Sequence, residues 1–167
     1  MDSNCATDDL RPDSTVTFEL RESVAWLGLD RPQKRNAIDN PLLTALQDSV
    51  TRAQADALAT VIFGHGPCFG AGLDLAEHRA RETEKVLHYS GAWHAVFTAN
   101  RRVDIPAIAA LHDATARGGP ELAKACHILL TNTTAFSAMP ADIRGIYVGG
   151  DISQHLARLL GQRGWPI

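Results

Sequence analysis

The sequence predicts an α/β protein built from a single domain. Three observations support this prediction: short apolar runs rich in β-branched residues, an amphipathic helical segment, and Gly-rich loops that twice join an apolar run to a helical segment. Strands that alternate with helices are typical of layered α/β folds. The chain has 167 residues, 45% hydrophobic and 21% charged, enough for one buried core. We expect the domain at residues 15–167, after a polar, disordered segment at residues 1–14.

The N-terminal part predicts a hairpin and a helix. Residues 15–20 and 24–30 are β-branched and aromatic runs separated by a short polar segment, which is typical of a hairpin. The pattern then changes, because Asn40 is a candidate helix cap and Pro41 suits the first helical position. Apolar residues follow at steps of three and four: Leu42, Leu43, Leu46, Val50 and Ala53. This spacing predicts an amphipathic helix from Asn40.

The rest of the chain repeats a strand, a loop and a helix. The later strands are expected from apolar runs at residues 59–65, 106–113 and 128–132. The segment ATARGGP, residues 114–120, predicts a Gly-rich turn. Helices are expected from Asp74 toward Val96, at residues 121–127 with Pro120 in the first turn, and at residues 151–161.

The composition argues against several classes of partner. The formal net charge is −3, so the chain lacks the broad basic surface that nucleic acid or an anionic membrane requires. No apolar run is long enough to span a membrane, and the N-terminus has no signal-peptide pattern. Three cysteines without CxxC spacing and seven histidines without HExxH spacing predict neither disulfides nor a metal site. We expect a cytoplasmic protein without nucleic-acid, membrane or metal partners.

The Gly-rich loop GHGPCFGAGLD, residues 64–74, has three interpretations. A phosphate-binding loop would need a lysine after its glycines, or a glycine in place of Phe69, and the sequence has neither. A tight strand-to-helix turn is the plainest alternative. The third is a pair of backbone donors, because this loop and the loop at residues 114–120 both lead into helices whose first N–H groups could face one oxyanion. Spacing alone leaves the last two interpretations open.

Four segments, in order, resemble the crotonase (enoyl-CoA hydratase/isomerase) family. They read RPQKRNAID, GPCFGAGLDLAEH, PAIAALHDATARGGPELAKACHILL and FSAMPADIRGIYVGGDISQHLARLLG, and the similarity covers residues 16–161. The resemblance implies an α/β spiral of repeated strand-strand-helix turns that binds an acyl-CoA thioester. Since the chain stops shortly after the fourth segment, it also implies a C-terminally shortened domain without the C-terminal helical part.

The resemblance also implies an active site. The N–H groups of Leu73 and Gly118 would form an oxyanion hole for a thioester enolate, and Glu121 would be the acid/base residue. The residues implied to contact the substrate are Ala71, Leu73, Asp74, Leu75, Ala76 and Gly118. Coenzyme A would enter as part of the substrate, with no other cofactor. Family members are lyases or isomerases of fatty acid metabolism, and a homo-oligomer, trimer or hexamer, is expected.

Departures from the family pattern keep other functions open. The second glutamate of the hydratases is replaced by Ala141, and Asp142 beside it is either a second acid or an exposed turn residue. Pro120 is expected to push Gly119 toward an extended conformation. The first hypothesis is an enoyl-CoA hydratase/isomerase-type enzyme. The alternatives are a hydrolase that cleaves a carbon–carbon bond of a β-diketone without coenzyme A, and a binding protein of this fold without catalysis.

Overall fold

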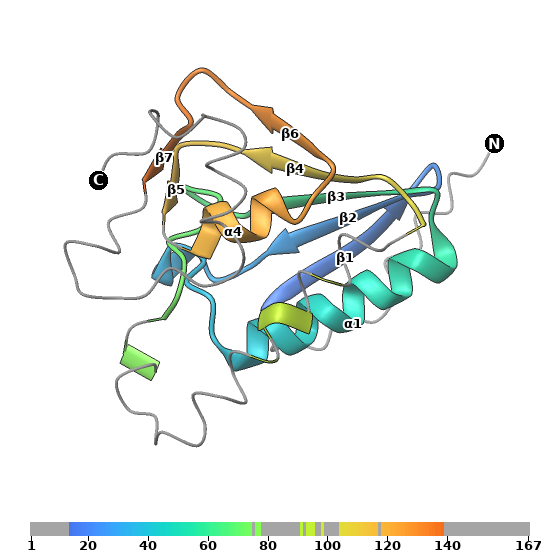
Figure 1. Cartoon of the computed structure of the whole chain (residues 1–167), viewed down its shortest axis with the longest axis horizontal. Helices are drawn as coiled ribbons and strands as arrows, with labels where there is room; N and C mark the ends of the chain where they lie inside the picture. The colour runs from blue at the N-terminus through green and yellow to red at the C-terminus, as the bar shows by residue number, and fades with distance from the viewer. Residues whose placement is uncertain are drawn as a thin grey trace.

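The computed structural model describes the central part of the chain (Figure 1). The described residues are 14–74, 76–77, 91, 93–95, 98, 104–116 and 118–138. The helix expected at residues 151–161 and all but the last residue of the segment 1–14 lie outside them. Of the helix expected from Asp74 toward Val96, residues 76–77, 91 and 93–95 are described and helical.

Within the described residues, five strands form one mixed sheet. In spatial order they are β1 (Val16–Arg21), β2 (Val24–Leu29), β3 (Ala59–Gly64), β4 (Ala107–Leu111) and β6 (Ile128–Thr131). β1 and β2 are antiparallel, and each later strand is parallel to its neighbour. Glu22 and Ser23 join β1 to β2 with positive φ angles of 47° and 66°, as the mirror-image turns of tight hairpins require. These strand predictions are confirmed.

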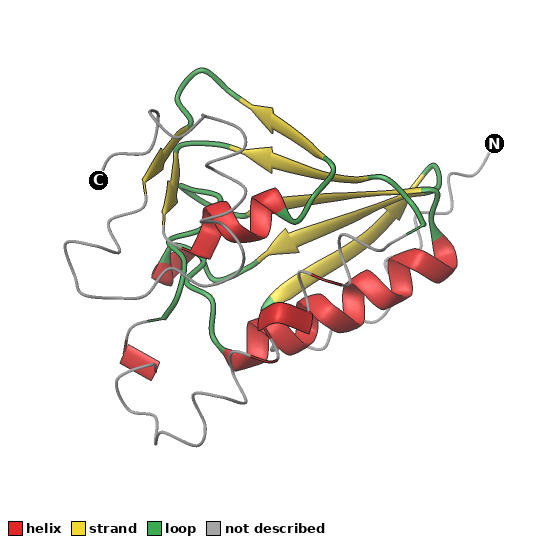
Figure 2. Cartoon of the chain, in the orientation of Figure 1, coloured by secondary structure: helices red, strands yellow, loops and turns green. Residues whose placement is uncertain are grey.

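The helix α1 (Asn40–Asp56) connects β2 to β3 and packs on the sheet (Figure 2). Its predicted apolar face is confirmed, since the five residues of that face are buried: Leu42, Leu43, Leu46, Val50 and Ala53. The predicted cap is one residue off. Asp39 is the N-cap, because its backbone is extended and its Oδ1 accepts a hydrogen bond from the Leu42 N–H at 3.0 Å. A short 3-10 helix, η1 (Pro32–Lys34), precedes this cap.

The turn predicted at residues 114–120 is partly wrong. β5 (Ala114–Ala116) begins this segment and pairs in parallel with β7 (Phe136–Ala138). Each strand has three residues and a distant partner, so no local pattern marks it. α4 (Gly118–Lys124) has Pro120 in its first turn, as predicted, but it begins two residues before that proline and ends at Lys124, three residues before the end of the predicted run. Gly119 is helical rather than extended, because glycine lacks the Cβ that clashes with a following proline ring.

The two helices share one face of the sheet. Strand order follows chain order, so right-handed crossovers bring α1 and α4 to the same side. One buried cluster of described side chains joins them: Leu46 of α1 and Leu122 of α4 pack with Leu27, Ile62 and Ala109 of the strands. β3 and β4 are parallel neighbours, so the Gly-rich loops that follow them leave from the same edge of the sheet.

Candidate active site

The first candidate donor, the Leu73 N–H, is oriented by a short backbone bridge. Ile38 donates its N–H to the Gly72 carbonyl at 2.7 Å and accepts the Asp74 N–H at 2.9 Å. In a parallel bridge of this kind, the residue between the two bonded neighbours turns its own N–H to the opposite side. Gly72 has a φ of +82°, which glycine adopts at little cost. The Leu73 N–H therefore points away from Ile38.

The second Gly-rich loop lies directly against the first. Gly70 forms a parallel bridge with Thr115 of β5. A Cβ atom placed on Gly119 would lie 2.6 Å from the Gly70 carbonyl oxygen, so a side chain does not fit there. The two backbones can touch because these residues are glycines, and this contact brings the segments of Leu73 and Gly118 together.

Gly118, the second candidate donor, is the first residue of α4. N–H groups in the first turn of a helix have no acceptor within the helix, so they can bind an external oxygen. Two backbone N–H groups thus belong to adjacent segments, and oxyanion stabilisation would use donors arranged in this way. Simultaneous contact of both N–H groups with one substrate oxygen stays a prediction.

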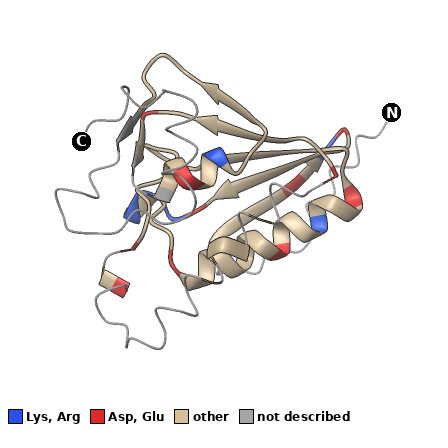
Figure 3. Cartoon of the chain, viewed as in Figure 1, with Lys and Arg blue, Asp and Glu red and all other residues tan. Residues whose placement is uncertain are grey.

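Glu121 lies in the first turn of α4 and is 8% exposed. Figure 3 shows both acidic and basic positions on this helix. The Glu121 Oε2 accepts a hydrogen bond from the Trp93 indole Nε1 at 2.8 Å. Burial raises the pKa of Glu121 to about 7, and the Trp93 hydrogen bond opposes part of this rise. A carboxyl with this pKa can hold and release a proton near neutral pH, as acid/base chemistry requires.

The Asp74 carboxylate, which the resemblance places near the substrate, makes structural contacts. Its Oδ2 lies 3.3 Å from Arg31 Nη2 and 3.3 Å from Lys34 Nζ, and its Oδ1 accepts the Ala76 and Glu77 N–H groups. Burial raises the pKa of Asp74, but the Glu77 N–H, Lys34 and Arg31 outweigh burial and hold the pKa below its ordinary value. Asp74 therefore fixes the end of the first Gly-rich loop.

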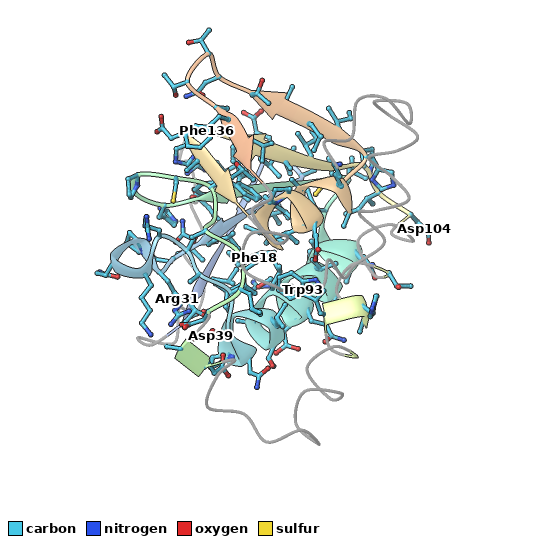
Figure 4. The ribbon with its side chains drawn as sticks, turned by 60° about the vertical axis from the view of Figure 1, so that its left-hand side comes forward. Phe18, Arg31, Asp39, Trp93, Asp104 and Phe136 are labelled. Atoms are coloured by element: carbon cyan, nitrogen blue, oxygen red, sulfur yellow. The ribbon has the colours of Figure 1, made fainter. Side chains whose placement is uncertain are left out.

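Arg31 connects this loop to the start of α1. Its Nη2 lies 2.8 Å from Asp39 Oδ2 and 3.3 Å from Asp74 Oδ2, and Figure 4 shows Arg31 next to Asp39. Asp39 caps α1, while Asp74 accepts the first N–H groups of the next helical residues. The Arg31 guanidinium thus connects the N-terminus of α1, at Asp39, to the helical residues that follow Asp74.

Asn36 is fully buried and organises the loop from within. Its Nδ2 lies 2.9 Å from the His65 and Cys68 carbonyl oxygens and 3.3 Å from that of Phe69. Its Oδ1 accepts the Arg31 N–H at 2.9 Å. Because one amide holds several loop carbonyls, it fixes the path of the chain toward the first candidate donor.

The other predicted site residues fall into two groups. Ala71 is half-buried and donates its N–H to the Arg35 carbonyl at 2.8 Å, and Ala76 is exposed at the start of a helical turn. Leu75 and the candidate second acid, Asp142, lie outside the described residues.

Three residues that shape the site were not predicted from the sequence. Trp93 lies 28 positions before Glu121, and no local pattern connects an indole to a carboxyl at that separation. Arg31 and Asn36 belong to the segment RPQKRNAID, which the resemblance had already marked. That segment was the available signal, but their contacts with the Gly-rich loop follow only from the fold.

The described side chains include no group of three His, Cys, Asp or Glu residues that could hold a metal ion. No helix in the same part of the chain has both the length and the apolar character needed to cross a membrane.

Comparison with known proteins identifies the family. The sequence profile of the enoyl-CoA hydratase/isomerase family matches residues 19–164. The enoyl-CoA isomerase/hydratase fer4 of Mycosarcoma maydis is 30% identical over 165 residues, covering 92% of this chain and 59% of fer4. The 2,3-dehydroadipyl-CoA hydratase of Escherichia coli (strain K12) is 30% identical over 153 residues, covering 89% of this chain and 58% of that protein. The chain spans about half the length of the curated relatives it matches.

A solved structure shares the fold. A candidate enoyl-CoA hydratase from Rhodopseudomonas palustris CGA009 matches with a TM-score of 0.82 and 43% sequence identity, over 89% of this chain and 57% of that one. The expected crotonase-like α/β fold is therefore confirmed. By its sequence profile, its relatives and its fold, the chain belongs to the enoyl-CoA hydratase/isomerase family.

Proposed function

We propose that this site binds an acyl-CoA thioester, stabilises its enolate between the N–H groups of Leu73 and Gly118, and uses Glu121 to move the proton. The observation that supports this most directly is the buried Glu121 carboxyl, which has a pKa of about 7 and shares the first turn of α4 with Gly118. A positioned acid/base group contributes about 10²–10⁴ to a reaction rate. The proposed enzyme is an enoyl-CoA hydratase or isomerase, that is, a lyase or an isomerase.

The two N–H groups would supply the electrostatic part of catalysis. When a proton leaves the carbon next to the thioester carbonyl, negative charge moves onto the carbonyl oxygen. Donors already directed at that oxygen stabilise the charge without rearranging, and loss of one such donor costs about 10²–10³ in rate. The Ile38 bridge supports Leu73 and α4 supports Gly118, so neither donor depends on a side-chain rotamer.

Glu121 would supply the proton-transfer part. In isomerisation, its carboxylate accepts a proton from one substrate carbon and the resulting acid returns the proton to another, which moves the double bond. In hydration, the acid gives its proton to the double bond, water supplies the hydroxyl group, and the carboxylate takes the remaining proton of the water. A pKa of about 7 populates both forms near neutral pH.

The proposed substrate is a CoA thioester with a double bond near the carbonyl. The names of the two relatives point to this class, since one is an enoyl-CoA isomerase/hydratase and the other a 2,3-dehydroadipyl-CoA hydratase. Coenzyme A enters as part of the substrate, and the proposed chemistry needs no other cofactor. A homo-oligomer, trimer or hexamer, stays a prediction that light scattering of the purified protein tests, and the cytoplasmic location stays a prediction as well.

The test compares the wild-type chain with Glu121→Gln and with the control Glu19→Gln, whose half-buried side chain lies on β1 and pairs with Arg21. Calorimetry measures the binding of crotonyl-CoA, and absorbance assays follow hydration and double-bond migration. We expect all three proteins to bind the thioester. Glu121→Gln should lose about 10²–10⁴ of the turnover, because glutamine cannot transfer a proton, while Glu19→Gln should keep it.

Other outcomes would select a different function. Failure of the wild-type chain to bind any CoA ester would overturn the proposal, and equal turnover by Glu121→Gln would remove Glu121 from the mechanism. Binding without turnover by the wild type would favour the binding-protein alternative. Cleavage of a β-diketone in the absence of coenzyme A would favour the hydrolase.

A further inference from the structure

Trp93 and Glu121 form a buried pair that connects two elements. The Trp93 Nε1–H donates to Glu121 Oε2 at 2.8 Å, and the two residues are 7% and 8% exposed. Trp93, labelled in Figure 4, belongs to the helical residues 93–95, whereas Glu121 belongs to α4. The Trp93 ring is part of the same buried cluster as Leu122. Packing and the hydrogen bond therefore act together to orient the carboxyl.

We propose that Trp93 is a positioning residue that reserves Oε2 of Glu121, so that Oε1 is the oxygen that accepts and returns the substrate proton. This inference rests on the proposed function and deepens it, because it names the reacting oxygen and the residue that selects it.

The assignment follows from the hydrogen-bonding capacity of the two groups. An indole N–H can donate but cannot accept. A protonated carboxyl has a carbonyl oxygen and a hydroxyl oxygen, and the carbonyl oxygen is the better acceptor for the indole. The proton therefore resides on Oε1 while Oε2 keeps the Trp93 hydrogen bond. The ionised carboxylate keeps the same bond in a charge-assisted form, so Glu121 need not rotate between its two states.

The groups around Glu121 leave this assignment undisturbed. α4 packs against β4 and β5, and neither strand contains a titratable residue. The other ionisable residue on α4 is Lys124, whose Nζ has no hydrogen-bond partner among the described residues. Next to Trp93, His94 is exposed to solvent. Burial and the Trp93 hydrogen bond are the causes that set the pKa of Glu121.

A ¹⁵N-labelled full chain without substrate allows a direct test by NMR. The chain has three tryptophans, and Trp93→Phe identifies the Trp93 indole signal by its loss. We expect this signal in the wild type to shift with a midpoint near pH 7, as Glu121 titrates. In Glu121→Gln it should be independent of pH and coincide with the low-pH position of the wild type, because the glutamine carbonyl accepts the indole N–H. Glu121→Ala supplies the position of an indole without this bond.

Two NMR results would overturn the inference. One is a wild-type signal at low pH that coincides with that of Glu121→Ala, which would mean that protonation breaks the bond at Oε2. The other is a Trp93 signal that does not respond to pH. Because no substrate is present, these results are independent of CoA-ester binding, so failure of this inference and failure of the proposed function can be told apart.

Kinetics provide a second readout. Trp93→Phe keeps an aromatic ring but removes the N–H, so we expect kcat to fall about tenfold with little change in KM. The Trp93 hydrogen bond lowers the pKa of Glu121. Loss of this bond should therefore raise that pKa and move the limb of the pH–rate profile that depends on Glu121 ionisation to higher pH. The control Trp26→Phe changes a ring that contacts Phe63 and Arg21, and should leave the limb in place. An unchanged limb in Trp93→Phe would contradict the inference.

Discussion

Replacing Asn36 with alanine should lower the free energy of unfolding by about 4 kcal/mol. The amide donates two N–H groups to loop carbonyls and accepts the Arg31 N–H. Three hydrogen bonds of this buried amide at about 1 kcal/mol each give about 3 kcal/mol. Asn36 also has a φ of +51°, a left-handed conformation that costs alanine about 1 kcal/mol more than asparagine. Such a total is large for one substitution.

Urea unfolding followed by circular dichroism measures this change, and two further variants separate its parts. Asn36→Gly removes the amide but tolerates the positive φ, so it should be about 1 kcal/mol more stable than Asn36→Ala. Asn36→Asp replaces the donors with an acid that faces three carbonyl oxygens. Burial and these carbonyls should raise the pKa of the new acid. Its destabilisation should therefore grow as the pH rises through that pKa.

The control is Asn132→Ala, which removes an exposed amide that caps a surface turn at Thr134 and should cost about 1 kcal/mol or less. An Asn36→Ala protein whose free energy of unfolding lies within about 1 kcal/mol of the wild-type value would contradict the predicted contribution of the amide. That result would mean that water or a shifted loop satisfies the carbonyls that the amide binds.

Three other perturbations test the loop contacts and the acid groups. Gly119→Ala places a methyl group 2.6 Å from a carbonyl oxygen of the first Gly-rich loop, so it should destabilise the protein by about 1–3 kcal/mol and lower turnover. Arg31→Ala leaves Asp74 without its guanidinium and should cost about 1–3 kcal/mol. The lowered pKa of Asp74 stabilises the protein above the ordinary carboxyl pKa and loses this effect as the pH falls. Arg31→Ala should therefore flatten the acid dependence of stability. The raised pKa of Glu121 does the opposite, because ionisation destabilises the folded state. Glu121→Gln should thus gain stability relative to wild type from pH 4.5 to pH 7, by about 3 kcal/mol.

Each of these predictions has a clear contrary outcome. Gly91→Ala is the control for Gly119→Ala, because a Cβ atom on this helical glycine meets nothing within 4 Å, and equal effects of the two changes would contradict the loop contact. An Arg31→Ala protein with the acid dependence of the wild type would show that the guanidinium does not contribute to the lowered pKa of Asp74. A stability difference between Glu121→Gln and wild type that stays constant with pH would contradict the raised Glu121 pKa.

Much of the fold could be predicted because the signals that define it are local. The β1–β2 hairpin follows from two β-branched runs, and α1 follows from apolar residues at steps of three and four. Local signals did not fix the exact ends of the helices, because neighbouring residues can begin a helix at similar energy. The cap of α1 is Asp39 rather than its neighbour, and α4 starts at Gly118. Local signals also failed for β5, because its pairing with β7 involves residues more than twenty positions apart.

The residues of the candidate site also fall into two sets: those that could be predicted from the sequence, and those that could not. Family resemblance marked Leu73, Gly118 and Glu121 from the motifs around the Gly-rich loops. It did not mark Trp93, because hydrophobic periodicity reports which residues are buried but not which buried polar atoms meet. The contribution of Asn36 was hidden for the same reason, since its partners are backbone carbonyls that leave no trace in side-chain patterns.

The α/β class, the hairpin, the amphipathic face of α1 and the family follow from the amino-acid sequence, because propensity, periodicity and motifs act within short stretches of chain. The contacts between distant atoms follow from the packing of the whole domain. This packing places the Gly119 backbone against Gly70, the Asn36 amide inside the first loop, and the Trp93 indole on Oε2 of Glu121. These contacts depend on how strands and helices pack in three dimensions, and packing also supplies the burial that raises the pKa of Glu121.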